Sequence, residues 1–302
     1  MSSTQKKIFL QVKYWPTWLG LGLLRLFATL PWRLVATLSD GLGWLIYYAY
    51  GSRRRIAEKN LSSCFPEWSN KQVQATAKRS FQLGMQAAFF TGIGWWASSR
   101  RYRSLVECDA SALDAYMAEG KNVIVLTPHF MGLETAGIYL SINRRFMTMY
   151  QYAKNALIHH YVVTKRGRFG GELVERKEPL RKMLRLIKSG MPLYYLPDQD
   201  AGRRGRFVPF FGVSASTFDM LGKMVKMTDA IVVPCSVEIR PKGQGMRIRF
   251  HPPLQGLPSG DDDQDVLLMN QQIESLIRQM PEQYLWAHKR FKTRPEGEAA
   301  FY

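Results

Sequence analysis

Short apolar runs alternate with helical stretches through the middle of the chain. Strand-like apolar patterns occupy residues 123–127, 146–150, 193–196 and 230–235. Apolar positions three and four residues apart predict helices over residues 133–140, 178–189 and 264–280. Residues 246–250 alternate in polarity and predict a more exposed strand. This order of strands and helices favours an α/β fold with a mainly parallel mixed sheet that is flanked by helices.

Two more helices are expected before the 123–127 strand. Helical spacing of apolar residues predicts the first over residues 70–90, and Gly92 and Gly94 are expected to end it. Residues 112–119 predict the second helix, which Gly120 ends in the manner of a C-terminal cap.

The first 60 residues form a strongly apolar segment with basic residues at both ends. Arg25 is the only charge between Tyr14 and Trp32, and a second apolar stretch follows up to Tyr50. A signal peptide is disfavoured because Arg25 interrupts the apolar stretch and no cleavage pattern follows. Three interpretations stay open: a spanning helix, a helix or helical hairpin in the membrane interface, and an apolar helix pair buried in the core. We favour a membrane-associated segment over residues 1–60 and a catalytic domain over residues 61–302.

Charge and composition narrow the function classes. The 302-residue chain carries 42 Lys and Arg against 24 Asp and Glu, so its formal net charge is +18, and 46% of its residues are hydrophobic. This apolar content excludes a disordered chain, and three cysteines without a CxxC spacing exclude a disulfide scaffold and a zinc ribbon. The basic excess indicates an anionic partner: nucleic acid, an anionic membrane surface or acidic substrates.

The first candidate site, Thr127-Pro-His129-Phe-Met-Gly-Leu-Glu134, directly follows the 123–127 strand. Open α/β sheets gather reacting groups at the carboxyl ends of their strands. On one helix the side chains of His129 and Glu134 would diverge by about 140°, so they meet only if His129 lies in the loop and Glu134 in the first helical turn. Glu134 would then hold the imidazole tautomer while the other ring nitrogen accepts a proton from a hydroxyl. The alternative is a structural loop histidine, and the spacing does not match a zinc pair, so no metal is expected.

Two further candidates are an arginine pair and an aspartate pair. Arg166-Gly-Arg168 lies in a basic stretch, and a turn at its glycine would bring two guanidiniums together around a phosphate. Part of this basic stretch is expected to be a solvated helix face. Asp198 and Asp200 follow the 193–196 strand, and the alternative for this pair is a loop-capping role. Nucleotide hydrolysis and dinucleotide redox chemistry have no support, since the chain has neither a GxxxxGK[ST] loop nor a GxGxxG motif.

Together these segments resemble the late acyltransferases of lipid A biosynthesis, which belong to the wider glycerolipid acyltransferase group. The group's His-x4-Asp/Glu motif matches His129…Glu134, and Asp198 with residues 207–212 is similar to a second block of the family. The closing segment, residues 281–295, is similar to the family's C-terminal signature. The likeness extends over nearly the whole chain.

The resemblance implies a glycerolipid-acyltransferase-like fold and transfer of an acyl chain to a hydroxyl of a lipid A precursor. The implied donor is a thioester on acyl carrier protein, the acceptor an anionic glycolipid, and the location the inner membrane with the catalytic domain on its cytoplasmic face. The resemblance implies that His129 is the general base with Glu134 as its partner, and that Arg166 and Asp198 serve activity. Arg168 and Asp200 join them as substrate-binding candidates from spacing alone. No cofactor, metal or covalent enzyme intermediate is expected.

Two other functions were weighed. The first is an acyltransferase of the same group that acts on another glycolipid or a lysophospholipid, with acyl-CoA or acyl carrier protein as donor. The second is nucleic-acid binding, which rests on charge alone and is disfavoured because no RNP, helix-turn-helix or zinc signature is present. An acyl chain would need an apolar pocket, for which the candidates are aromatic residues that are equally compatible with the core: Phe89, Phe90, Trp95, Trp96, Phe210 and Phe211.

Overall fold

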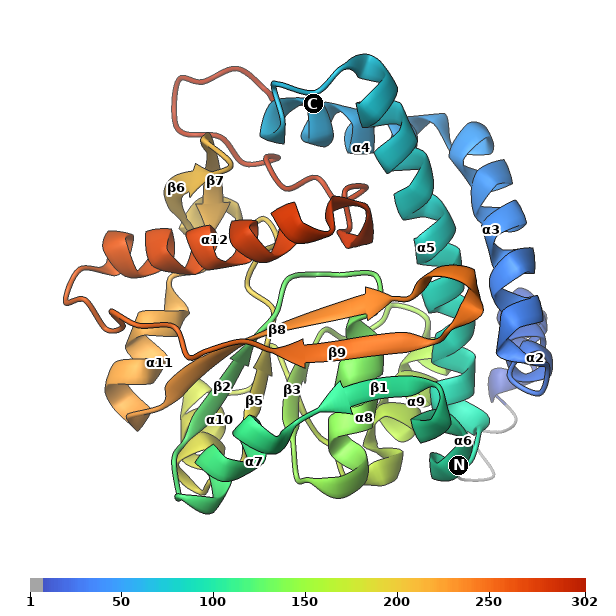
Figure 1. The fold of residues 1–302 in the computed structure, drawn as a ribbon, viewed down its shortest axis with the longest axis horizontal. Helices are drawn as coiled ribbons and strands as arrows, with labels where there is room; N and C mark the ends of the chain where they lie inside the picture. The colour runs from blue at the N-terminus through green and yellow to red at the C-terminus, as the bar shows by residue number, and fades with distance from the viewer. Residues whose placement is uncertain (1–7) are drawn as a thin grey trace.

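A seven-stranded sheet forms the centre of the computed structural model, which describes residues 8–302 (Figure 1). Its strand order is β1-β9-β8-β2-β5-β3-β4. The strands are β1 (Val106–Asp109), β2 (Val123–Leu126), β3 (Met147–Tyr150), β4 (Glu172–Glu175), β5 (Leu193–Tyr195), β8 (Ile231–Ile239) and β9 (Met246–Phe250). Only β8 and β9 pair antiparallel, and every other neighbouring pair within this sheet is parallel. The predicted α/β class and the mainly parallel mixed sheet are confirmed.

Helices surround the sheet, and a short hairpin stands beside it. The helices are α2 (Trp15–Phe27), α3 (Trp32–Ala49), α4 (Gly51–Cys64), α5 (Asn70–Trp96), α6 (Ser99–Ser104), α7 (Ser111–Ala118), α8 (Leu133–Asn143), α9 (Ala156–Arg166), α10 (Leu180–Lys188), α11 (Met220–Thr228) and α12 (Asp262–Gln279). The hairpin consists of β6 (Arg206–Phe210) and β7 (Val213–Thr217), which pair antiparallel. All elements predicted between residues 112 and 280 are present within a few residues of their expected bounds. The strands β1 and β4, the hairpin, α9 and α11 were not predicted.

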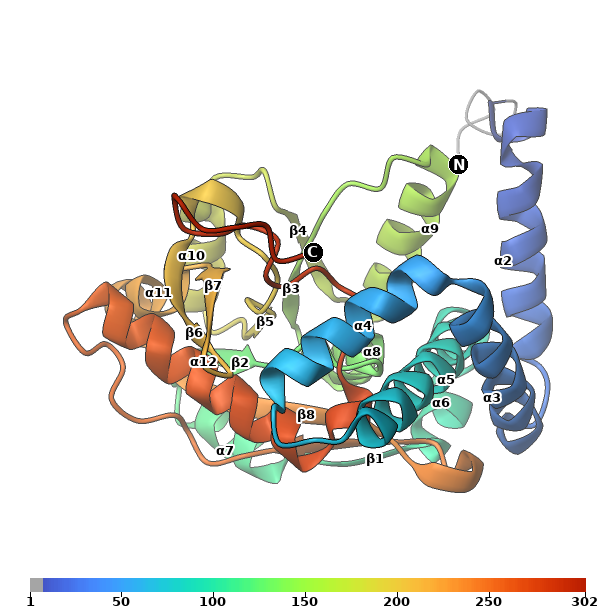
Figure 2. The ribbon, with the colours of Figure 1, turned by 90° about the horizontal axis from the view of Figure 1, so that it is seen from above.

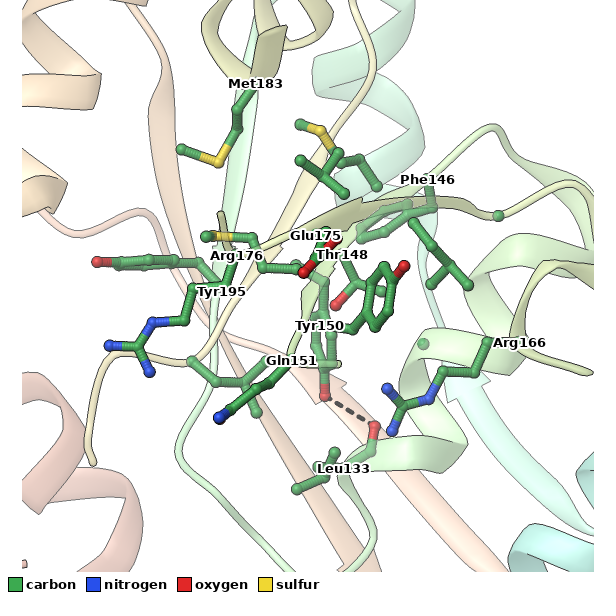
Figure 3. A pocket seen from close by; sticks show the side chains of 18 of the residues that line it. Leu133, Phe146, Thr148, Tyr150, Gln151, Arg166, Glu175, Arg176, Met183 and Tyr195 are labelled. Atoms are coloured by element: carbon green, nitrogen blue, oxygen red, sulfur yellow. Dashed lines mark hydrogen bonds between the residues drawn. The ribbon is translucent and has the colours of Figure 1, made fainter. Parts of the chain in front are cut away.

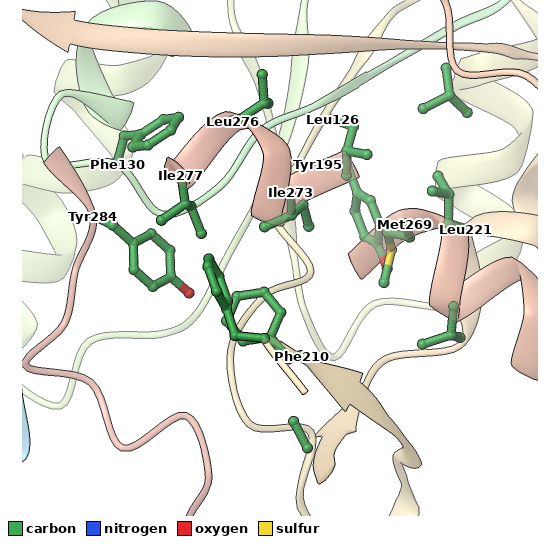
Figure 4. Packing of buried hydrophobic residues seen from close by; sticks show 14 of the residues in the cluster. Leu126, Phe130, Tyr195, Phe210, Leu221, Met269, Ile273, Leu276, Ile277 and Tyr284 are labelled. Carbon is green, nitrogen blue, oxygen red and sulfur yellow. The ribbon is translucent and has the colours of Figure 1, made fainter. Parts of the chain in front are cut away.

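Alternate side chains of β2 enter two separate cores, which lie on the two faces of the sheet. Ile124 and Leu126 pack with apolar residues of α10, α11 and α12, whereas Val123 and Val125 pack with those of α5, α7 and α8. Figure 4 shows the first core, where Ile273 of α12 lies close to Leu126. A strand covered on both faces reads as a continuous apolar run, which explains why β2 has the clearest strand pattern of the chain.

Helix α5 continues through the glycines that were expected to end it. It runs from Asn70 to Trp96, and Ser69 caps its first turn by accepting a hydrogen bond from the backbone N–H of Gln72. A Cβ atom at Gly92 would lie 2.6 Å from the carbonyl oxygen of Leu24 in α2, which is closer than atoms can approach. The expected helix break is therefore wrong, because Gly92 serves the close approach of two helices.

The N-terminal helices α2 and α3 pack against α5 on one flank of the molecule (Figures 1 and 2). No helix in the described part of the chain combines the length and the apolar character needed to cross a membrane. The inner sides of α2 and α3 are buried in the second core, for example at Leu21 and Val35. Their other sides form an outer apolar face of large exposed residues: Trp15, Leu19, Leu23, Leu26, Leu34, Leu38, Leu42, Trp44 and Leu45. Membrane association and the division of the chain at residue 60, a position inside α4, stay predictions.

Candidate active site

His129 lies in the loop between β2 and α8, at the carboxyl end of the sheet's central strand. Glu134 lies in the first turn of α8, so both residues occupy the local positions that the sequence predicted. The loop is held by the C-terminal segment, since the N–H of Met131 donates to the carbonyl of Gln283 at 2.7 Å and the N–H of Leu285 to the carbonyl of His129 at 3.1 Å. The loop conformation is therefore fixed by residues more than a hundred positions away.

The side-chain partner of His129 is Asp198. One carboxylate oxygen of Asp198 lies 2.6 Å from imidazole Nδ1, and the other accepts the backbone N–H of His129 at 2.8 Å. Asp198 follows β5, which runs parallel to β2 with Tyr195 opposite Leu126, so the two loops leave the sheet side by side. The predicted pairing of the imidazole with Glu134 is corrected, because the carboxylate at Nδ1 comes from the neighbouring strand.

Asp198 is fully buried but ionised. Burial alone would raise its pKa, but the electrostatic interaction with the adjacent His129 side chain and the hydrogen bonds from that residue outweigh burial and hold the pKa below its ordinary value. The hydroxyl of Tyr284 donates to the backbone carbonyl of Asp198 at 3.4 Å. With Nδ1 directed at the carboxylate, Nε2 is the ring nitrogen left to exchange a proton, and the His129 side chain is 19% exposed and so reachable.

Glu134 instead binds Arg166, the last residue of α9. The Nε atom of Arg166 lies 2.8 and 2.9 Å from the two carboxylate oxygens, and Nη2 lies 2.6 Å from one of them. Burial would lower the pKa of Arg166, but the charge and hydrogen bonds of Glu134 outweigh it and raise the pKa above its ordinary value. Within residues 8–302 no protein acceptor bonds to Nη1 of Arg166, so this nitrogen remains to bind an anionic group.

Arg168 and Asp200, the two candidates added from spacing, make structural contacts. Arg168 donates to the carbonyls of Gly94 and Ala97 at 3.1 and 2.6 Å, where a guanidinium satisfies the free carbonyls at the end of α5. Asp200 accepts the backbone N–H and the hydroxyl of Thr293 at 3.0 and 2.9 Å. The guanidiniums of Arg166 and Arg168 do not converge, since Arg166 is the end of a helix and Arg168 turns toward α5. The expected phosphate-binding turn is therefore wrong.

A cavity of about 500 Å³ is lined by His129 and by residues of β3, β4 and β5. Figure 3 shows part of its wall, including Thr148, Glu175 and Tyr195. Its wall is mostly apolar, with side chains from α8, α10 and the sheet: Leu133, Met147, Met149, Val174, Met183 and Leu196. Arg166 lies at one side of this cavity and Arg176 at the other, as Figure 3 shows. The cavity thus joins a polar end, which carries His129, to an apolar interior.

The aromatic residues proposed for an acyl pocket do not line this cavity. Phe90, Trp95, Phe210 and Phe211 are at most 7% exposed and belong to the two cores. Methionine and leucine side chains line the cavity instead, together with other aromatic residues such as Tyr150 and Phe218. The three Met-bearing elements of its wall, β3, α10 and the start of α11, had no sequence feature that distinguished a cavity wall from a core. In the described part of the chain, no group of three or more His, Cys, Asp and Glu side chains is arranged to hold a metal ion.

A histidine held by a buried carboxylate, at the end of an apolar cavity in an α/β sheet, is a site for proton transfer on a substrate with a long apolar part. Comparison with known proteins identifies the family to which the chain belongs. The family model "Bacterial lipid A biosynthesis acyltransferase" matches residues 3–293. The chain therefore belongs to this family and is an acyltransferase.

Individual relatives match along nearly their full length. The chain is 33% identical to the lipid A biosynthesis palmitoleoyltransferase of Escherichia coli K12, over 97% of this chain and 96% of that protein. It is 31% identical to the lauroyltransferase of the same organism, again over 97% and 96%, and 33% identical to a lipid A biosynthesis acyltransferase of Haemophilus influenzae, over 96% and 92%.

Proposed function

We propose that this protein transfers a fatty acyl chain from an acyl carrier protein thioester to a hydroxyl of a lipid A precursor. The observation that carries the proposal is the pair His129–Asp198 at the polar end of an apolar cavity. The names of the relatives support the acceptor class, since they act in lipid A biosynthesis with palmitoleoyl and lauroyl groups. The net charge of +18 suits both an acidic carrier protein and an anionic glycolipid.

His129 acts as the general base of the reaction. Its Nε2 accepts the proton of the acceptor hydroxyl while the oxygen attacks the thioester carbonyl, and the tetrahedral intermediate then expels the thiolate, which takes the proton from the imidazolium. Asp198 holds Nδ1 and stabilises the imidazolium while it exists. The ester bond forms and the thioester bond breaks without a covalent bond to the enzyme.

Arg166 supplies the positive charge of the site. Its Nη1 lacks a protein partner among the described residues, whereas Nε and Nη2 are held by Glu134. A guanidinium fixed in this way stabilises negative charge without reorganising, either on the tetrahedral oxyanion or on a phosphate of the acceptor. Glu134 is therefore a positioning residue for Arg166.

The proposal includes binding of the outer apolar face of α2 and α3 to a membrane surface. Exposed apolar side chains that enter the boundary between lipid head groups and acyl chains leave water, and the burial of their apolar area stabilises binding to the membrane surface. The location at the inner membrane, with the active site on the cytoplasmic side, gives the enzyme an acceptor that is anchored in lipid and a donor that is soluble.

The test is acyl transfer by the purified protein with acyl carrier protein as donor and a lipid A precursor as acceptor, read by mass spectrometry. His129→Ala is expected to abolish transfer, whereas His251→Ala is the matched control, because His251 contacts Ser236 at 3.0 Å and does not line the cavity. Wild-type transfer by His129→Ala would refute the mechanism. Acylation of another glycolipid or a lysophospholipid, with no product from the lipid A precursor, would refute the proposed acceptor.

A further inference from the structure

Helix α10 carries a row of exposed cations beside the cavity. Arg181, Arg185 and Lys188 follow one another at helical spacing and therefore lie on one side of α10, opposite Met183 and Ile187 in the core. We call the exposed basic residues of α10 and the preceding loop the α10 basic face: Arg176, Lys177, Arg181, Arg185 and Lys188.

These charges have no counter-charges of their own. Among the ion pairs formed within residues 8–302, none includes a member of the α10 basic face, although the neighbouring Lys182 pairs with Glu178 at 2.7 Å and with Glu172 at 3.7 Å. Like charges at the spacing of Arg181 and Arg185 destabilise a helix. An acidic partner that contacts this row of unpaired cations would relieve their mutual repulsion.

The α10 basic face begins where the cavity reaches the surface. Arg176, Pro179 and Leu180 line the cavity, and both Arg176 and Leu180 are exposed. Figure 3 shows Arg176 on the side of the cavity opposite Arg166. Because Leu180 and His129 both line this cavity, a group that enters past Leu180 can reach His129 within it.

The same face lies away from the outer apolar face of α2 and α3. Figures 1 and 2 both show α10 and α11 on one flank and α2 and α3 on the other. A flat lipid surface that covers the outer apolar face does not reach the α10 basic face, which remains open to a soluble partner.

We propose that the α10 basic face is the docking surface for the acidic carrier protein that delivers the acyl thioester. This inference rests on the proposed function, in which the donor is such a protein. The cations of α10 contact acidic side chains of the carrier, and the thioester arm enters the cavity between Arg176 and Leu180. Docking contributes to the encounter with the donor and not to the chemical step.

The test reverses two charges that lie outside the cavity, Arg181→Glu with Arg185→Glu. At low ionic strength we expect KM for the acyl carrier protein to rise about tenfold or more with kcat unchanged, because steering by unpaired charges accelerates association by that order. The difference shrinks at high salt. With an acyl-pantetheine donor, which has the thioester but no protein, the variant and the wild type should be equally active.

A matched control keeps the positive charge and the spacing but changes location. Arg55→Glu with Lys59→Glu reverses two exposed cations four positions apart on α4 and should leave KM for the carrier unchanged. An unchanged KM in the α10 variant, or an equal loss with both donors, would overturn the docking role. A loss of binding to anionic vesicles with KM unchanged would assign the face to lipid instead. If the wild type does not use a carrier donor at all, the proposed function itself fails.

Discussion

Asp198 holds His129 at two points, with one carboxylate oxygen 2.6 Å from imidazole Nδ1 and the other 2.8 Å from the backbone nitrogen. One side chain thus fixes both the ring and the loop that carries it. Because Asp198 is fully buried, its charge is not screened by solvent and acts on the imidazole at close range. The pair is a buried, fixed contact, as the proposed general base requires.

Replacing Asp198 by the isosteric asparagine tests the pair. Asp198→Asn keeps a hydrogen bond to the backbone of His129 but removes the charge that stabilises the imidazolium and its tautomer. We expect kcat to fall about 10²- to 10⁴-fold, with KM for either substrate nearly unchanged. Steady-state kinetics at saturating donor and acceptor measure this effect.

The matched control lies two positions further along the same loop. Asp200→Asn weakens the contact with Thr293, so it should lower the melting temperature while retaining most of kcat. Equal losses of kcat in the two variants would mean that Asp198 acts only by holding the loop.

Local pattern was sufficient to predict the positions of His129 and Glu134, but it did not predict the contact between His129 and Asp198. The strand and the helix start on either side of His129 follow from apolar periodicity over neighbouring residues. Asp198 is 69 positions away, and its contact depends on β2 and β5 being neighbours in the sheet. Periodicity identifies strands without giving their order, so the nearer carboxylate, Glu134, was taken for the partner.

Glu134 and Arg166 form a half-buried ion pair. We expect the effects of replacing each residue on the free energy of unfolding to be non-additive. The two side chains are 15% and 29% exposed, so either single variant, Glu134→Gln or Arg166→Gln, leaves a poorly solvated charge without its partner. The double variant removes both charges. We expect a coupling free energy of about 0.5–3 kcal/mol from chemical denaturation of the four proteins.

Activity should not follow stability in this cycle. In the proposed mechanism Arg166 stabilises negative charge during the reaction, so the double variant should regain stability but remain inactive. The exposed pair Lys121–Glu119, at 2.8 Å, is the control and should show a coupling of about 0–1 kcal/mol. If the double variant regains activity as well, Arg166 has no role beyond neutralising Glu134.

Glycines and aromatic residues illustrate what the sequence could not distinguish. The sequence around Gly92 predicts the end of a helix, because glycine destabilises a helix interior. In the structure Gly92 lies inside α5, where the absence of a side chain allows close contact with Leu24 of α2. Phe210 and Phe211 read equally well as pocket or core, since both environments favour large apolar side chains. Only the arrangement of the sheet and α10 shows that methionines line the cavity.

Met183 should influence the length of the acyl chain that the enzyme transfers. It lies on α10, is 5% exposed and lines the apolar part of the cavity. Met183→Trp fills space and should shift the preference toward shorter chains, whereas Met183→Ala should admit longer ones. Each methylene is worth about 1–3 kcal/mol of discrimination in such a pocket, so competing carriers that differ by two carbons should change rank in the product mass spectrum.

A second methionine separates pocket from core. Met224 of α11 is fully buried but does not line the cavity, so Met224→Ala should cost about 2–5 kcal/mol of stability without altering chain preference. A shift in chain preference for Met224→Ala, or none for either Met183 variant, would show that another region measures the chain.

The outer apolar face of α2 and α3 should determine binding to lipid. Leu19 and Leu38 belong to different helices and are 67% and 49% exposed, so glutamate at both positions should leave the fold intact. Each leucine that enters an apolar phase contributes about 1.5–3 kcal/mol, and the double variant Leu19→Glu with Leu38→Glu should therefore bind anionic vesicles more than tenfold more weakly in co-sedimentation. Met227→Glu on the opposite flank, where Met227 is 40% exposed, should bind like the wild type. Equal vesicle binding by all three proteins would show that the exposed leucines do not contribute to membrane binding. Basic side chains would then be the source of the attraction to anionic lipid.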